Sequence, residues 1–233
     1  MAAIDRSVVE HLSLFSDLGG ADIDALLGEA RAVRFAKGAH VFEQGGEAHA
    51  FYVLLHGHLQ AVKTTPDGQQ IVMRYVSPGE VFGVAMAIGV SAYPATAIAV
   101  VESVALAWPS AAWPRIAARY PSLVASTLQT IGQRLQDAQT RIIEASTQEV
   151  ERRVAHALLR LAQQAGRKIE RGIEIDFPIS RQDIAEMTGT TLHTVSRILS
   201  AWEKRGLVAS GRRRIVIRDA HQLFVVAERP REA

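Results

Sequence analysis

The stretch SRQDIAEMTGTTLHTVSRIL, residues 180–199, decides the fold of the C-terminal part of the chain. Ser180 can cap a first helix, and Asp183 three residues later completes the pattern of a capping box. Gly189 stands where that helix must stop and turn, because glycine adopts a left-handed conformation at little cost. Thr191 can cap a second helix. The stretch therefore predicts two short helices joined by a tight turn, a helix-turn-helix.

The second helix of this motif is predicted to have one apolar and one polar face. Apolar residues would pack the two helices together: Ile184, Ala185, Val195, Ile198 and Leu199. The opposite face carries His193, Ser196 and Arg197, which can face base edges in the major groove of DNA. A plain hairpin of two helices in a bundle is the alternative. The small residue, the glycine and the branched apolar residues at compatible offsets favour the DNA-binding motif.

A hairpin with an arginine run follows the motif. Gly206 ends the second helix, and residues 208–217, VASGRRRIVI, have the pattern of a strand, a glycine turn and a β-branched strand. That pattern is typical of a wing. A charge run alone is usually a solvated face. Beside a helix-turn-helix, contact with DNA phosphates is the better interpretation of Arg212, Arg213 and Arg214.

Composition limits the class of protein. The chain has 233 residues, 48% hydrophobic and 21% charged, which is ordinary for a globular protein of one large or two small domains. No run approaches the roughly 18 apolar residues needed to span a bilayer, and residues 1–6 lack the basic and apolar segments of a secretory signal. We therefore expect a cytoplasmic protein without a membrane partner. The sequence has no cysteine, which excludes disulfides, thiolate zinc sites and cysteine-ligated iron–sulfur clusters, and no metal site is predicted.

Charge is unevenly distributed along the chain. From Gln148 onward there are 16 Lys and Arg against 11 Asp and Glu, whereas the preceding part has 10 against 13. The basic part coincides with the helix-turn-helix. This distribution fits a nucleic-acid-binding domain joined to a domain of another kind.

The N-terminal half has a different pattern. Residues 5–30 look helical and amphipathic, with a turn at Gly19-Gly20. Short strand-like runs separated by turn signals follow, at residues 33–35, 40–42, 51–55, 59–62, 71–75, 81–82 and 97–101. Short strands at this spacing predict an all-β sandwich or barrel.

A long helix is predicted after Pro114 and Pro121. Its apolar residues alternate spacings of four and three, as in a heptad seam: Val124, Leu128, Ile131, Leu135, Ala138, Ile142 and Ala145. A helix that packs on its own domain needs a wider apolar face, so the narrow seam favours a coiled coil between two copies of the chain. A further helix is predicted from near Ser146 to Gly166, which places a hinge at residues 144–148.

This order of a β-roll, a long helix and a winged helix-turn-helix resembles the Crp/Fnr family of bacterial transcription regulators over nearly the whole chain. The glycine framework of a cyclic-nucleotide-binding fold is similar to residues 37–38, 42–45, 51–57, 67–68 and 78–83. The resemblance implies an α+β fold with three parts. These are N-terminal helices and an effector-sensing β-roll, or jelly roll, at residues 1–113; a dimerisation helix at 114–146; and a winged helix-turn-helix DNA-binding domain at 147–233.

The resemblance also implies roles at the DNA surface. It assigns base reading to four residues: Leu192, His193, Ser196 and Arg197. It assigns phosphate contacts to Ser180, Thr191, Thr194, Lys204, Arg205 and the wing arginines. Both main branches of the family have Glu where this chain has His193, so we expect a different base pair at that point of the half-site. The implied partners are double-stranded DNA with an inverted-repeat operator, a second copy of the chain, and RNA polymerase if the protein is an activator.

The implied effector pocket contains Phe82, Gly83, Val84, Tyr93, Ala95 and Thr96. In the cyclic-AMP-binding members a Gly-Glu pair binds the ribose and an Arg-Ser/Thr pair binds the phosphate. Here Val84 stands in place of that Glu and Ala95 in place of that Arg. Only Thr96 is left to donate a hydrogen bond. Burying a phosphate without a cationic partner is costly, so no tight binding of cyclic AMP is predicted.

Other effectors stay open. The oxygen-sensing members of the family need cysteines for their iron–sulfur cluster, and this chain has none. What remains are haem-based gas sensors, sensors of other small ligands, and members controlled by abundance alone; the pocket and helix-turn-helix stretches also resemble the nitric-oxide-responsive Dnr/Nnr-like branch. Haem needs an axial histidine, and four histidines lie in the β region, where each can instead be a solvated turn or sheet-face residue: His40, His49, His56 and His58. The alternative function is a haem- or small-ligand-binding sensor module without direct DNA contact. No catalytic motif is present, and we expect no enzyme.

Overall fold

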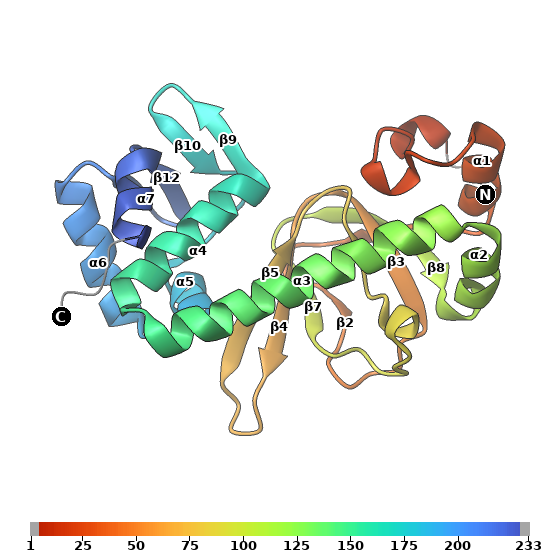
Figure 1. The fold of residues 1–233 in the computed structure, drawn as a ribbon, viewed down its shortest axis with the longest axis horizontal. Helices are drawn as coiled ribbons and strands as arrows, with labels where there is room; N and C mark the ends of the chain where they lie inside the picture. Colours follow the sequence, from red (N-terminus) through yellow and green to blue (C-terminus); the bar gives the residue numbers. More distant parts are fainter. Residues whose placement is uncertain (1–4, 229–233) are drawn as a thin grey trace. The chain divides into compact units, whose positions relative to one another are not determined.

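The computed structural model describes residues 5–228 (Figure 1). Residues 1–4, which belong to the segment without a secretory pattern, lie outside the described residues. The chain divides into two compact units. Within the described residues the first contains 5–68 and 73–136, and the second contains 69–72 and 137–228, so that one boundary falls between Gln136 and Asp137 in the long helix α3 (Pro121–Thr147). None of the described helices has the length and apolar character that a membrane span requires.

The first unit contains two four-stranded sheets. One has the order β1-β8-β3-β6 and consists of β1 (Arg31–Phe35), β8 (Ser103–Pro109), β3 (Ala50–His56) and β6 (Val81–Phe82). The other has the order β2-β7-β4-β5 and consists of β2 (His40–Phe42), β7 (Thr96–Ala99), β4 (Leu59–Thr64) and β5 (Gln70–Val76). Except for the consecutive strands β4 and β5, neighbouring strands are distant in sequence, as in a jelly roll. The predicted β-sandwich is confirmed.

Helices cover one side of this sandwich. Ile23, Leu26 and Leu27 of α1 (Gly20–Gly28) belong to one buried cluster with residues of β3, β8 and α2 (Trp113–Arg119). Trp108 of β8 lies in that cluster and its indole N–H donates to the carbonyl of Leu26 at 2.9 Å. This bond satisfies the one polar atom of a large buried ring, which is the usual requirement for burying tryptophan.

Three of the predictions for residues 5–147 differ from the structure. The expected helix at residues 5–30 is two 3₁₀ turns, η1 (Arg6–Val8) and η2 (Ser13–Phe15), followed by α1. Strand β8 was not predicted, because nearly all of its residues are buried and a strand buried on both faces shows no alternation. The predicted start of a helix at Ser146 is wrong. Ser146 lies in the last turn of α3, and its hydroxyl donates to the carbonyl of Ile142 at 2.8 Å, a bond that serine can make inside a helix as well as at a cap.

The second unit combines helices with a third four-stranded sheet, whose order is β11-β12-β10-β9. Its elements are α4 (Val150–Ala165), β9 (Gly166–Ile169), β10 (Gly172–Ile175), α5 (Arg181–Thr188), α6 (Leu192–Lys204), β11 (Val208–Gly211), β12 (Arg214–Ile217) and α7 (Ala220–Glu228). The wing hairpin β11–β12 is present as predicted. The hairpin β9–β10 was not predicted, and it extends the wing sheet by two strands (Figure 1).

Candidate nucleic-acid interface and effector pocket

The helix-turn-helix is built by the capping bonds that its sequence predicts. The Ser180 hydroxyl accepts from the backbone N–H of Asp183 at 3.1 Å, and the Asp183 carboxylate accepts from the N–H of Ser180 at 2.6 Å. Gly189 ends α5 with φ of 62°, in the left-handed region. The Thr191 hydroxyl accepts from the N–H of Thr194 at 3.2 Å and caps α6. These local bonds fix the start of each helix and the turn between them.

Packing fixes which face of α6 points outward. Val195, Leu199 and Trp202 have no exposed surface, and the indole N–H of Trp202 donates to the Glu151 carboxylate of α4 at 2.7 Å. The opposite face exposes Leu192, His193 and Arg197, while Ser196 is half-buried. The predicted base-reading residues therefore share one side of the helix, three of them freely accessible.

The predicted phosphate-contact residues fall into two groups. Four of them are exposed and make no ion pair within residues 5–228: Lys204, Arg205, Arg212 and Arg213. The others are already engaged by the fold. The Thr191 and Thr194 hydroxyls lie 3.0 Å apart, and the Ser180 hydroxyl donates to Asp183 at 2.7 Å. The Arg214 guanidinium binds both carboxylate oxygens of Glu174 on β10, so the arginine run is not uniform.

Two residues of the predicted effector pocket join an aromatic cluster. Tyr93 stacks on Phe42 with 3.8 Å between ring centroids, and Phe82 stacks on Tyr52 at 5.0 Å. A Cβ added to Gly83 would lie 3.1 Å from the rings of Phe42 and Tyr52. Side chains of the protein thus fill the space beside Gly83, a filling that sequence reasoning missed because Phe42 comes from a distant strand.

The polar groups of this cluster are satisfied internally. The Tyr93 hydroxyl donates to the carbonyl of Ala50 at 2.7 Å and accepts from its N–H at 3.2 Å. Burial raises the pKa of Tyr93, so the phenol stays neutral. Val84 is not part of this aromatic cluster and packs against another buried cluster, which contains residues of α1, α2, β3, β6 and β8.

A carboxylate lies at the predicted phosphate position. The Thr96 hydroxyl accepts from the N–H of Gln44 at 3.0 Å and donates to the Glu43 carboxylate at 3.4 Å. Glu43 also contacts Nδ1 of His40, and this hydrogen bond holds the pKa of Glu43 below its usual value. The neighbouring Ala95 supplies no cation. The one polar side chain left in this part of the pocket is thus paired with a negative charge.

The four histidines considered as haem ligands lie apart along the β region. His40 contacts Glu43, and Nδ1 of His49 lies 3.1 Å from the carbonyl of Glu47. His56 is exposed at the end of β3, and His58 is half-buried and directly precedes β4. Within the described part of the chain no three His, Asp or Glu side chains form a group that could hold a metal ion.

Comparison with known proteins identifies the family. Residues 32–120 match the cyclic nucleotide-binding domain, and residues 152–224 match the Crp-like helix-turn-helix domain. The transcriptional regulator LdrP of Thermus thermophilus is 31% identical over 187 residues, which cover 80% of this chain and 91% of LdrP. The chain belongs to the Crp/Fnr family of transcription regulators.

Other members of the Crp/Fnr family match over most of their length. The cyclic AMP receptor protein of Thermus thermophilus is 28% identical over 214 residues, covering 92% of this chain and 96% of that protein. The structure of FixK2 from Bradyrhizobium japonicum superposes with a TM-score of 0.76 at 22% identity, covering 86% of this chain and 98% of FixK2. The FixK2 match supports the fold alone. The resemblance to the Crp/Fnr family is confirmed, whereas the relatives named above do not single out the Dnr/Nnr-like branch.

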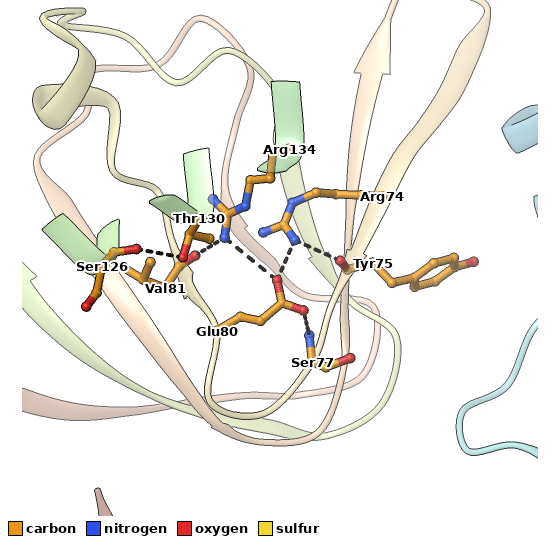
Figure 2. A network of polar contacts seen from close by, with 8 residues as sticks. All are labelled: Arg74, Tyr75, Ser77, Glu80, Val81, Ser126, Thr130 and Arg134. Carbon is orange, nitrogen blue, oxygen red and sulfur yellow. Dashed lines mark hydrogen bonds and ion pairs between the residues drawn. The ribbon is translucent and has the colours of Figure 1, made fainter. Parts of the chain in front are cut away.

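In this Crp/Fnr protein an ion cluster also joins α3 to the β-roll (Figure 2). Glu80, in the turn between β5 and β6, accepts from Arg74 at 2.5 Å and from the N–H of Ser77 at 3.0 Å. Arg134 of α3 donates to the carbonyl of Val81 and lies 3.7 Å from the Glu80 carboxylate. Burial, and then the charge of Arg74, lowers the pKa of Arg134 to about 10, so Arg134 is cationic at neutral pH. The guanidinium groups of Arg134 and Arg74 share the Glu80 carboxylate.

This sharing predicts an asymmetric response to substitution. Glu80→Gln leaves two positive charges close together and partly buried, and should lower the free energy of unfolding by about 3 kcal/mol. Arg134→Met leaves Glu80 paired with Arg74 and should lower it by about 1 kcal/mol. Urea unfolding followed by tryptophan fluorescence measures both values.

Glu102→Gln serves as the control for Glu80→Gln. Glu102 forms an exposed pair with Arg34, and its loss should change stability by under about 0.5 kcal/mol. Equal changes in the free energy of unfolding for Glu80→Gln and Glu102→Gln would show that the carboxylate shared by two arginines stabilises the fold no more than an exposed one.

Proposed function

We propose that the protein is a homodimeric regulator that reads an inverted repeat on double-stranded DNA and whose β-roll does not bind cyclic AMP. Membership of the Crp/Fnr family carries the DNA-binding regulator; the dimer, the base contacts and the effector class are the further content of the proposal. The observation that carries it is the outward face of α6, which presents His193 and Arg197 while its other face is buried. The protein acts in the cytoplasm, by binding and by shifting conformational populations rather than by catalysis.

Base reading rests on the chemistry of that face. The planar fork of Arg197 fits the two acceptors of guanine in the major groove. His193 can donate to guanine or accept from an amino group, whereas the Glu found there in related branches only accepts. Leu192, which is 48% exposed, offers an apolar contact for a thymine methyl group. The half-site should therefore differ from the sequences read by the main branches.

The homodimer is supported by apolar residues that α3 leaves uncovered. Leu128, Leu135 and Ile142 are 51%, 60% and 66% exposed and follow one another at seven-residue spacing on one helix face. Of the other predicted seam residues, Ala145 is exposed and three are half-buried: Val124, Ile131 and Ala138. A second copy of the same helix would cover this stripe, because a heptad seam is complementary to itself. A twofold dimer would place two recognition helices about one DNA turn apart, and an activating dimer would take RNA polymerase as a further partner.

The effector proposal rests on the pocket. A cyclic phosphate at Thr96 would lie close to the Glu43 carboxylate, which already accepts from the Thr96 hydroxyl. It would find no cationic partner at Ala95. Stacked rings of Phe42 and Tyr93 occupy the adjoining space. Repulsion and the missing space both act against a cyclic nucleotide.

Isothermal titration calorimetry with cyclic AMP tests this part. The purified protein should give no binding heat at micromolar concentrations, because the phosphate has no cationic partner in the pocket. The cyclic AMP receptor protein of Thermus thermophilus provides a matched positive control. Saturable binding of micromolar affinity by this protein would contradict the proposal.

Arg197→Ala tests base reading. Once the operator has been selected from a random DNA pool, this substitution should weaken operator binding by about 1–3 kcal/mol and leave binding to random duplex much less affected. Fluorescence anisotropy with both DNAs measures the difference. Lys204→Ala is the control, since loss of a phosphate contact should weaken both complexes alike. An equal loss on both DNAs for Arg197→Ala would make Arg197 a phosphate contact.

Leu135→Glu tests the dimer. A buried, unpaired carboxylate in the seam should dissociate the dimer, and sedimentation velocity should then show a monomer with greatly weakened operator binding. Gln136→Glu adds the same charge at the neighbouring exposed position and should leave the dimer intact. A dimer of unchanged affinity in Leu135→Glu would place the subunit interface elsewhere.

A further inference from the structure

The first strand of the wing is held by a carboxylate of α6. Glu203, in the last turn of α6, accepts from both the backbone N–H and the hydroxyl of Ser210 on β11, at 2.8 and 2.6 Å. Arg181, the first residue of α5, donates to the same hydroxyl at 2.8 Å. The hydrogen bonds from Ser210 hold the pKa of Glu203 below its usual value, so this group is charged at neutral pH. Both helices of the helix-turn-helix are thus joined to the wing at one residue.

The second strand and the turn of the wing are held as well. Arg214 of β12 binds both carboxylate oxygens of Glu174 on β10, with the longer bond at 3.1 Å. The carbonyl of Arg213 accepts from the N–H of Ile179, just before the cap of α5, at 3.2 Å. Besides the backbone pairing of β12 with β10, the wing is therefore attached to α6, α5 and β10 through three of its residues: Ser210, Arg213 and Arg214.

The tip of the wing holds an arginine in a strained conformation. Gly211 pairs with Arg214, so the turn consists of Arg212 and Arg213. Arg213 has φ of 59°, and it is the one non-glycine residue within the described chain with positive φ. Glycine or asparagine would adopt this conformation at lower cost. A strained residue that a rigid frame keeps in place suggests that its side chain has a function.

The charges of the two attachments run against simple attraction to DNA. Glu203 and Glu174 are negative groups next to a surface that binds a polyanion, and by charge alone their loss should strengthen binding. We propose that both are positioning residues, which fix the wing so that Arg212 and Arg213 reach the DNA backbone, and that Arg214 serves the attachment and not the phosphate. This inference rests on the proposed DNA-reading function.

The direction of the change in DNA affinity distinguishes a positioning role of the two glutamates from simple charge repulsion. The variants are Glu203→Ala and Glu174→Ala, with Glu170→Ala in the exposed turn of the β9–β10 hairpin as a control that removes the same charge from the same unit. Binding to a duplex of random sequence is measured by fluorescence anisotropy. The control should bind as tightly as the unaltered protein or slightly more tightly. The two other variants should bind about 5-fold more weakly, because the loosened wing must be ordered on binding.

The salt dependence of binding assigns the arginines. Arg213→Gly relieves the left-handed strain but removes a phosphate contact, so the slope of log affinity against log salt should fall by about 1 per subunit. Arg214→Ala, like the two glutamate variants, should weaken binding with the slope unchanged. An equal fall in slope for Arg213→Gly and Arg214→Ala would overturn the assignment.

Stability and function are kept apart in this design. Thermal unfolding of each variant shows whether it is folded. If Glu203→Ala does not fold, Ser210→Ala replaces it: this variant removes only the bonds of the Ser210 hydroxyl and should also weaken DNA binding. If Glu203→Ala and Glu174→Ala bind as tightly as Glu170→Ala, the positioning role is wrong while DNA binding stands. If the unaltered protein shows no salt-dependent binding to any duplex, the proposed function itself fails.

Discussion

The rotation of α6 about its own axis is the constraint on which DNA reading depends. Three residues of this helix, Val195, Leu199 and Trp202, have no exposed surface. A helix turns by 100° per residue, so burying these positions directs His193 and Arg197 to the opposite side. The bond from Trp202 to Glu151 adds a directional contact to apolar packing, which by itself has no direction. The chemistry at the DNA surface is therefore set by side chains that cannot touch DNA.

The β-roll shows how a framework can persist while its chemistry changes. Glycines at turns determine the path of the backbone, as Gly83 does with φ of 69°. Ligand recognition depends on side chains that those glycines do not specify. In this chain the Glu43 carboxylate accepts from the Thr96 hydroxyl, and the ring of Phe42 stacks on Tyr93. The match to the cyclic nucleotide-binding domain thus describes the fold of residues 32–120 and leaves the ligand to be decided by the pocket.

Sequence reasoning succeeded where signals are local. Ser180 and Asp183 are three residues apart, and the capping box they form needs no information from the rest of the chain. It failed for β8, whose burial on both faces removes the alternation that marks a strand. It also missed the contact of Thr96 with Glu43, which are 53 residues apart in sequence. That contact depends on the pairing of Phe42 with Ala97 across two strands, and the pairing register follows from packing of the whole sandwich.

Net charge describes the DNA-binding unit less well than the placement of its charges. The basic excess counted after Gln148 includes Arg214, whose charge is matched by Glu174 and contributes little to the outward field. The acids Glu174 and Glu203 are in turn engaged by wing residues, which reduces their repulsion of phosphate. Five exposed basic side chains lie on α6, at its C-cap and in the wing turn: Arg197, Lys204, Arg205, Arg212 and Arg213. Attraction to the DNA backbone depends on the charges that reach it. Because ion pairs within the unit cancel some charges and leave others exposed, the basic surface is defined by the unpaired side chains and not by the net charge.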